Sequence, residues 1–219
     1  MLILLPPSEK KNPATGQDRF DLSGLSFAKE LTSARKMAIE DLGEVQLEPS
    51  LTSPAIEIYG GVLYQGLGWK TLSAAAKKRA ASQVLIVSAL FGLVKPLDQI
   101  YKYKVKIDNR LWREAINQIS SAYTEELVID CRSSTYKGIW NINPERTIEV
   151  RVFKIVDGDR LVITHMSKKY RGELTRHLLQ QASEPTTPAE LHRIAGQLFE
   201  CELHAPANGQ PWALDLLIS

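Results

Sequence analysis

Residues 84–98 read VLIVSALFGLVKPLD, and the interpretation of the whole chain starts from this stretch. Its first four residues, Val84 to Val87, are all apolar, which is the pattern of a strand covered on both faces of a sheet. Ser88 and Ala89 then mark the end of that strand. Because open α/β sheets usually build their binding sites at the carboxyl ends of the strands, we expect a candidate site just after Ser88.

Apolar patterns on either side of this stretch predict further strands and helices. Residues 2–5 and 127–129 are short apolar runs that indicate two more buried strands. Residues 147–155 alternate apolar and polar, and Asp157-Gly158 precedes another apolar run, which predicts a hairpin. The other predicted elements are helices over residues 25–42, 111–123, 168–181 and 188–199 and a closing strand over residues 212–218. This interleaving predicts an α/β (mixed α+β) fold with a single central mixed sheet flanked by helices.

Length and composition favour one domain. A chain of 219 residues that is 44% hydrophobic can bury one substantial core, and no Gly, Ser or Pro run is long enough to act as a linker. We therefore expect a single domain over residues 1–219. The apolar start of the chain stops at Pro6 and Pro7, which is too short for a signal peptide or a membrane span. We therefore predict a cytoplasmic protein that does not bind a membrane.

The cysteines and histidines do not indicate a metal site. Cys131 and Cys201 have no CxxC partner, so neither a zinc site nor a disulfide framework is predicted. A nucleophilic Cys131 stays open, although a cysteine that merely packs at the end of a strand is the favoured interpretation. The histidines show no metal-ligand spacing (His165, His177, His192 and His204). We predict no metal and no cofactor.

Positive charge is concentrated in the middle of the chain. The formal net charge is only +2, but residues 67–113 hold 10 Lys and Arg against 2 Asp and Glu, while residues 1–66 and 114–219 are each negative by 3. A local excess of this kind is expected of a surface that binds a polyanion, because binding releases counterions. A solvated basic face that is balanced in space by acidic residues elsewhere is the alternative.

Residues 64–79, YQGLGWKTLSAAAKKR, are the most specific local feature. A Gly-apolar-Gly turn before an Ala- and Lys-rich helix is typical of a helix-hairpin-helix DNA-binding element, here over about residues 57–80. The glycines would let the backbone approach a phosphate, and the basic side chains would add charge. The predicted contacts are Gly66, Gly68, Lys70, Lys77, Lys78 and Arg79, and they would grip the DNA backbone without reading sequence. The alternative is an ordinary connection between two helices.

Two other basic segments extend this candidate DNA surface. Lys95, Lys102 and Lys104 follow the buried strand and could contact phosphates. The interleaved Tyr101 and Tyr103 are expected either to offer stacking surfaces or to pack in the core. A predicted helix near the carboxyl end carries a second group (Lys168, Lys169, Arg171 and Arg176). Positive side chains at the start of a helix are repelled by the positive end of the helix dipole, so a bound anion would reduce this electrostatic repulsion.

An enzyme is the main rival to the interpretation as a DNA-binding protein. The DNA-binding interpretation includes no catalytic residue. Polar residues at one end of the sheet could act on a nucleotide or a phosphorylated small molecule (Ser8, Asp130, Ser133, Tyr136, Lys168 and Arg171). No P-loop, G-x-S-x-G, H-E-x-x-H or Rossmann glycine fingerprint is present. A third, weaker possibility is a stress protein that acts through a protein partner; which partner is unknown.

Several blocks together resemble the YaaA family of peroxide stress resistance proteins (UPF0246), in the shorter form found in actinobacteria. The blocks are LILLPPSE at residues 2–9, YGGVLY at 59–64, SALFGLVKPLD at 88–98, DCRSSTY at 130–136 and KKYRG at 168–172. The resemblance implies an unusual α/β fold with a basic cleft and a helix-hairpin-helix element. It also implies sequence-nonspecific binding of double-stranded DNA under oxidative stress by hydrogen peroxide, which protects the DNA, and a lower level of free intracellular iron.

The chain departs from the family pattern in one block. Residues 102–105 read KYKV, where the family usually has Pro-Tyr-Arg-Leu, and the connection over residues 107–112 is shortened. Lysine keeps the charge of the arginine but not its bidentate geometry. A phosphate contact there is therefore expected to be a simple charge interaction.

Overall fold

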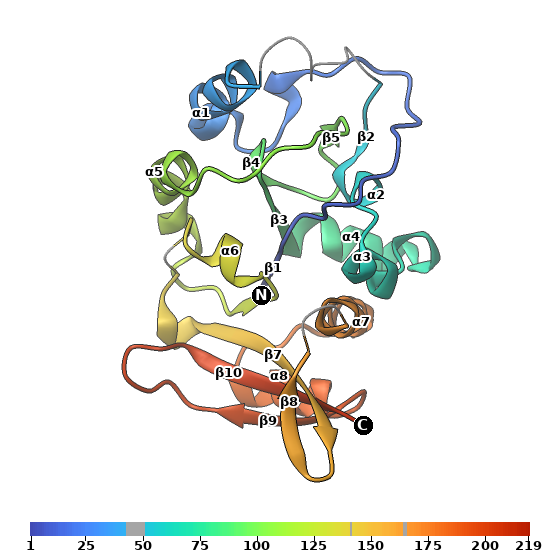
Figure 1. Ribbon diagram of the computed structural model, residues 1–219, viewed down its shortest axis with the longest axis vertical. Helices are drawn as coiled ribbons and strands as arrows, with labels where there is room; N and C mark the ends of the chain where they lie inside the picture. Colours follow the sequence, from blue (N-terminus) through green and yellow to red (C-terminus); the bar gives the residue numbers. More distant parts are fainter. Residues whose placement is uncertain (43–50, 141, 164–165) are drawn as a thin grey trace.

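The computed structural model describes residues 1–42, 51–140, 142–163 and 166–219 and has the predicted mixed α/β architecture (Figure 1). The strands of the large sheet are β1 (Leu2–Leu5), β3 (Val84–Ser88), β4 (Gly92–Val94), β6 (Val128–Asp130), β7 (Thr147–Val156), β8 (Asp159–Val162), β9 (Glu200–His204) and β10 (Trp212–Ile218). A separate small sheet pairs β2 (Ser53–Pro54) with β5 (Gln99–Ile100).

Eight α-helices lie in the described part of the chain. They are α1 (Ala28–Glu40), α2 (Ala55–Ile58), α3 (Val62–Leu67), α4 (Ala74–Gln83), α5 (Asn109–Ser120), α6 (Ser134–Lys137), α7 (Ser167–Gln180) and α8 (Pro188–Ala195). Short 3-10 turns cover Leu22–Gly24, Trp69–Thr71, Ser121–Tyr123 and Pro144–Arg146. None of the helices in these described ranges combines the length and the apolar character needed to cross a membrane.

The large sheet places the first strand of the chain near its middle. Its order is β4-β3-β1-β6-β7-β10-β9, and β8 pairs with β7 beside this path. β1 runs parallel to β3 and to β6, so that Ile3 lies opposite Val84 on one side and Ile129 on the other. β7 is parallel to β6 and to β10, whereas β4, β8 and β9 are antiparallel to their neighbours. The carboxyl ends of β1, β3 and β6 therefore meet at one edge.

Helices cover both faces of the sheet around β1. Because side chains alternate along a strand, Leu2 and Leu4 pack with α1 and α5, while Ile3 and Leu5 pack with residues of α3, α4 and α7. In Figure 1, α1 and α5 accordingly lie on one side of β1 and β3, and α3 and α4 lie on the other. A fully buried arginine, Arg35 of α1, fastens the turn between β3 and β4 through donations to the carbonyl oxygens of Phe91 and Leu93 at 2.9 and 2.8 Å.

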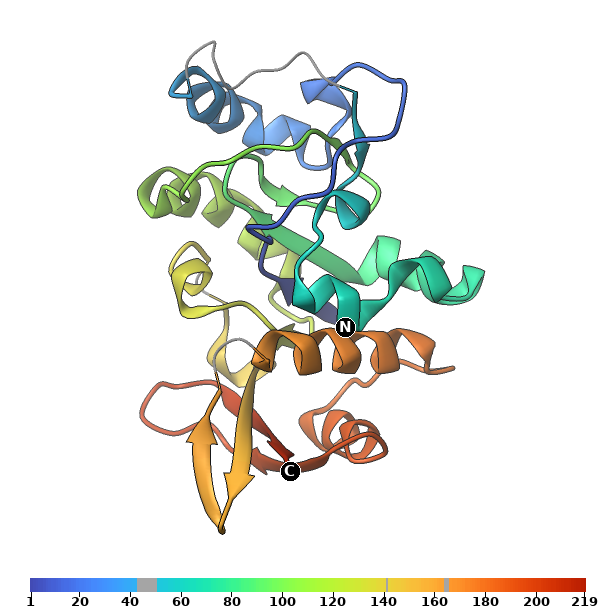
Figure 2. The same cartoon turned by 45° about the vertical axis from the view of Figure 1, so that its right-hand side comes forward.

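One long helix joins the two halves of the molecule. In Figure 2, α7 lies between α3 and α4 above and α8 below, with the β7–β8 hairpin projecting at the bottom. Apolar residues of α7, such as Leu174 and Leu178, share one core with Val150 of β7 and Leu214 of β10. A displacement of α7 would therefore disturb both halves of the sheet.

Two glycines set the close crossing of α3 and α7. A Cβ atom on Gly172 of α7 would lie 2.0 Å from the carbonyl oxygen of Leu63, and one on Gly66 of α3 would lie 2.4 Å from the carbonyl oxygen of Lys169. No side chain fits at such distances. The two helix backbones approach closely because both positions are glycine.

The structure confirms most predicted elements and leaves one unconfirmed. The hairpin is present, and its turn residues Asp157 and Gly158 both have positive φ, 52° and 88°, as tight hairpin turns require. The helix-hairpin-helix element is not confirmed. Gly66 is not part of a turn but lies inside α3, and Gly68 alone, with φ of 59°, ends that helix before the 3-10 turn Trp69–Thr71. The short elements β4, β9 and α6 were not predicted.

Candidate functional site

A cavity opens at the sheet edge where β1, β3 and β6 end. Its volume is about 620 Å³. The chain leaving β1, the chain leaving β6, the start of α3 and the start of α7 supply its walls; Figure 1 shows where these elements lie. The lining residues are Pro6, Pro7, Ser8, Glu9, Lys10, Gly61, Val62, Leu63, Tyr64, Gln65, Ser133, Thr135, Tyr136 and Lys168. We call it the Tyr136 cavity.

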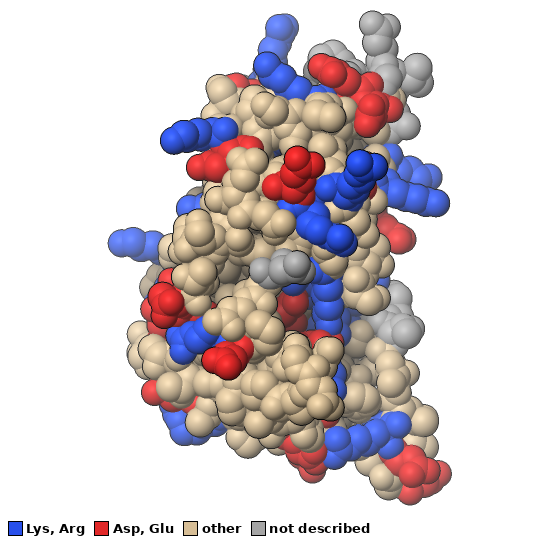
Figure 3. Space-filling model, turned by 90° about the vertical axis from the view of Figure 1, so that its left-hand side faces the viewer, with Lys and Arg blue, Asp and Glu red and all other residues tan. Residues whose placement is uncertain are grey.

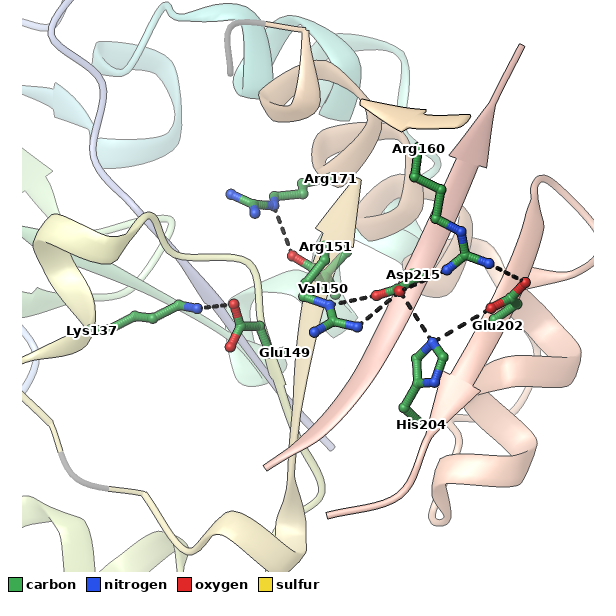
Figure 4. A network of polar contacts seen from close by, with 9 residues as sticks. All are labelled: Lys137, Glu149, Val150, Arg151, Arg160, Arg171, Glu202, His204 and Asp215. Atoms are coloured by element: carbon green, nitrogen blue, oxygen red, sulfur yellow. Dashed lines mark hydrogen bonds and ion pairs between the residues drawn. The ribbon is translucent and has the colours of Figure 1, made fainter. Parts of the chain in front are cut away.

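Four of the six residues considered for an enzyme line the Tyr136 cavity, and two do not. Ser8, Ser133, Tyr136 and Lys168 come together from four segments of the chain. Asp130 instead turns inward, where it accepts bonds at 2.9 Å from Nε and Nη2 of Arg132. Arg171 donates from Nε to the carbonyl oxygen of Val150 at 3.1 Å (Figure 4).

Several polar groups in the cavity have no protein partner among the described residues. The hydroxyls of Ser133 and Thr135 make no hydrogen bond there, although Ser133 precedes α6 and could have capped it. Lys10 and Lys168 form no ion pair within the same ranges. Burial raises the pKa of Tyr136 to about 12, so its hydroxyl remains protonated at neutral pH and can donate. Free donors of this kind suit a polar or anionic ligand.

A second hollow adjoins the cavity beside α3. It measures about 320 Å³, shares Lys10, Tyr64 and Gln65 with the cavity, and reaches Gly68 and Lys70. We call the two adjoining hollows the Lys10 groove. The groove runs from Lys168 through Lys10 to Lys70. Sequence reasoning found Lys70 and Lys168 but missed Lys10, because a single lysine in a turn carries no local signal.

The predicted DNA-binding lysines divide by their surroundings. Five are exposed and form no ion pair among the described residues (Lys70, Lys78, Lys102, Lys104 and Lys168). Three others contact neighbours: Lys77 lies over the ring of Trp69, Lys95 lies over the ring of Phe27, and Lys169 pairs with Glu173 at 3.4 Å. A phosphate is expected to be bound first by the lysines without partners, because nothing must be displaced.

The predicted arginines join helices instead of pointing outward. Arg79 of α4 donates from Nε to the carbonyl oxygen of Leu179 at 2.7 Å. Nη1 of Arg176 donates to the carbonyl oxygens of Leu67 and Gly68 at 3.1 and 2.9 Å, which satisfies the end of α3. Together with Arg171, these side chains hold α7 in place.

A buried chain of hydroxyl groups lies behind the groove. The hydroxyl of Tyr103 is 2.8 Å from Oγ of Ser88 and 2.9 Å from the hydroxyl of Tyr59. Nζ of Lys11 lies 4.1 Å from the ring centre of Tyr103 and donates to the carbonyl oxygen of Ser8. Burial lowers the pKa of Lys11 to about 8. Tyr103 is buried and packs in the core, which was one of the two alternatives for this residue.

A second polar cluster lies on the face of β7, β10 and β9 that is turned away from α7 and α8. Figure 4 shows Asp215 between Arg151, Arg160 and His204, and the carboxylate of Asp215 is 2.5, 3.5 and 3.1 Å from them. Asp215 is only 2% exposed because these partners cover it. The charged groups of this cluster pair with one another and hold β10 between β7 and β9.

The surface charge is mixed where Figure 3 shows it. Basic and acidic side chains are interspersed on that face, and neither sign forms a continuous area. Within the described ranges, no group of three or more His, Cys, Asp and Glu lies close enough to hold a metal ion. Cys131 is fully buried, and burial raises its pKa to about 12, so it packs as a strand-end cysteine. His165 lies outside the described residues.

Comparison with known proteins identifies the family. Residues 21–203 match the family described as "Peroxide stress protein YaaA". A UPF0246 protein of Streptomyces coelicolor is 34% identical over an alignment that covers 100% of this chain and 98% of the relative. A UPF0246 protein of Corynebacterium efficiens is 36% identical over 89% of this chain and 91% of the relative. The chain therefore belongs to the YaaA family of peroxide stress proteins.

Proposed function

We propose that this protein binds double-stranded DNA without sequence preference through the Lys10 groove and thereby protects DNA during peroxide stress. One observation supports the proposal most: the two hollows share lining residues, and Lys168, Lys10 and Lys70 line them without ion-pair partners in the described ranges. A row of unpaired ammonium groups suits a row of phosphates better than one small anion. Ammonium groups contact the phosphates and not the base edges, so the binding is independent of sequence.

The size of the effect follows from the number of lysines. Each phosphate contact on duplex DNA contributes about −0.9 to the slope of log Kobs against log salt concentration. Three contacts give a slope of about −2.7, so affinity is expected to fall by about 40-fold between 50 and 200 mM salt. Additional contacts from Lys102 and Lys104 would make the slope steeper.

Fluorescence anisotropy with a short labelled duplex tests the proposal. The variant Lys10→Gln/Lys70→Gln/Lys168→Gln is expected to lose most of the salt dependence and most of the affinity. A matched control, Lys29→Gln/Lys36→Gln/Lys154→Gln, removes three exposed lysines that do not line the groove and should bind as the unaltered protein does. Absence of binding at 50 mM salt, or equal losses in both variants, would refute the proposal.

The family resemblance extends the proposal to limiting free intracellular iron. The same groove variant provides the test, because it separates DNA binding from the rest of the protein. Chelatable iron would be measured in cells carrying the unaltered protein, the groove variant or neither. If the groove variant lowers iron as the unaltered protein does, iron limitation does not depend on the groove.

An enzyme acting on a nucleotide or a phosphorylated small molecule is the second candidate. It is favoured by the gathering of Ser8, Ser133, Tyr136 and Lys168 around one cavity. It predicts that a free mononucleotide raises the unfolding temperature by mass action and is converted to a product. Unchanged unfolding temperatures with millimolar mononucleotides would remove this candidate.

A further inference from the structure

The Tyr136 cavity does not match the shape of an intact duplex. Its volume of about 620 Å³ lies within the range of about 300–1,000 Å³ that is usual for small-ligand pockets. A duplex is far wider and can only lie across the cavity mouth. Groove binding alone therefore leaves the cavity, together with the free hydroxyls of Ser133 and Thr135, without a role.

The lining of the cavity is divided between flat apolar walls and a charged rim. Pro7 and the half-buried ring of Tyr136 offer surfaces on which a base can stack. The hydroxyls of Ser133 and Thr135 and the amide of Gln65 can bond to the polar edge of a base. Lys10 and Lys168 are exposed and can hold the phosphates on either side of it.

Glu9 helps to decide which nucleotide fits. Its carboxylate lines the same cavity and forms no ion pair among the described residues. A carboxylate repels a nucleoside diphosphate or triphosphate, whose charge is concentrated in one place. It can accept a bond from the exocyclic amino group of cytosine or adenine. The cavity thus suits a neutral base better than a polyphosphate.

We propose that the Tyr136 cavity receives one unpaired, extruded nucleotide of the DNA that lies in the Lys10 groove. This inference rests on the proposed DNA-binding function. Extrusion costs least where the nucleotide is already unpaired, as in a bulge or at a damaged site. The protein then binds a duplex with one unpaired nucleotide more tightly than a perfect duplex of the same length and charge.

Two neighbouring residues of α6 provide a matched pair of variants. Thr135 is exposed and lines the cavity, so Thr135→Trp fills the cavity without removing a charge. Ser134 is equally exposed on the same helix but does not line the cavity, so Ser134→Trp adds the same bulk elsewhere. Thr135→Leu is a smaller filling variant, for use if the tryptophan variant does not fold.

Affinities are measured for a perfect duplex and for the same duplex with one unpaired 2-aminopurine, whose fluorescence reports its stacking. The unaltered protein and Ser134→Trp are expected to prefer the second duplex by at least about tenfold. Thr135→Trp should lose this preference and bind the two duplexes with equal affinity, whereas Ser134→Trp should keep it. Equal affinities in the unaltered protein, with strong salt dependence, would overturn the inference and leave the proposed function standing. Stabilisation by free dAMP without binding to either duplex would overturn both.

Discussion

Replacing Gly172 by alanine tests how α3 and α7 are held together. The added Cβ would stand 2.0 Å from the carbonyl oxygen of Leu63 and 2.9 Å from the backbone nitrogen of Leu67, whereas ordinary contact begins at 3.4 Å. Both atoms belong to the backbone of α3, so no side chain can move aside. The helices must separate by more than an ångström, and the packing between them is lost.

The cost can be estimated from two opposing terms. Alanine favours a helix interior over glycine by about 1 kcal/mol. Overpacking of a well-packed core costs about 1–3 kcal/mol and more where the obstacle is rigid. Because the obstacle here is backbone, we expect a net loss of about 2 kcal/mol. For a chain of this length, that loss lowers the unfolding temperature by about 4–8 °C.

Thermal unfolding followed by circular dichroism measures the loss. Gly138→Ala is the control, since its Cβ would meet only Nη2 of Arg113 at 3.5 Å, and its unfolding temperature should stay close to that of the unaltered protein. Gly66→Ala meets Lys169 across the same crossing, so the double variant Gly66→Ala/Gly172→Ala should lose less than the sum of the single losses. A Gly172→Ala protein within 1 °C of the unaltered one would refute the close-crossing argument.

Three further predictions concern individual side chains. Asp215→Asn keeps the size of the side chain but removes the charge that Arg151, Arg160 and His204 surround. Urea unfolding should therefore show that the free energy of unfolding falls by about 1–3 kcal/mol. An unchanged urea midpoint would mean that the cluster does not contribute to stability. Burial lowers the pKa of Lys11 to about 8 in the folded protein, below its value in the unfolded chain. Between pH 8 and 9.5 the unfolded state therefore binds more protons than the folded state, so the free energy of unfolding rises with pH. Urea midpoints should show this rise in the unaltered protein and not in Lys11→Met; equal slopes would contradict it. Burial raises the pKa of Cys131 to about 12, so iodoacetamide at pH 8 should modify this cysteine only after the protein unfolds. Mass spectrometry of native and urea-treated protein measures the modification. Rapid labelling of Cys131 in the native protein would contradict its buried position.

Local patterns were sufficient to predict the main elements and the edge on which the site lies. The apolar runs at residues 84–87 and 127–129 identified neighbours of β1, and parallel pairing then brought Ser8 and Ser133 to one edge. The alternation over residues 147–155 identified β7. These signals depend only on side-chain periodicity, which the sequence contains directly.

The sequence did not indicate contacts that depend on partners outside the local pattern. Gly66 was interpreted as a turn residue, but its role is set by Lys169 on another helix. Asp130 was grouped with the site, but Arg132, two residues later, turns it inward. Arg79 and Arg176 were predicted to contact DNA, and the structure shows that they donate to carbonyl oxygens at helix ends, a role that the sequence did not indicate. Such pairings are invisible to periodicity and local propensity.

The central place of β1 has a consequence for how the chain folds during synthesis. Leu2–Leu5 leave the ribosome well before the strands on either side of them, which begin only at Val84 and Val128. Until those residues emerge, this apolar strand has no partner on either edge and is open to pairing with other chains. Folding of the sheet is therefore expected to be slow and non-local, and a nascent chain halted before residue 128 should depend on chaperones to remain unaggregated.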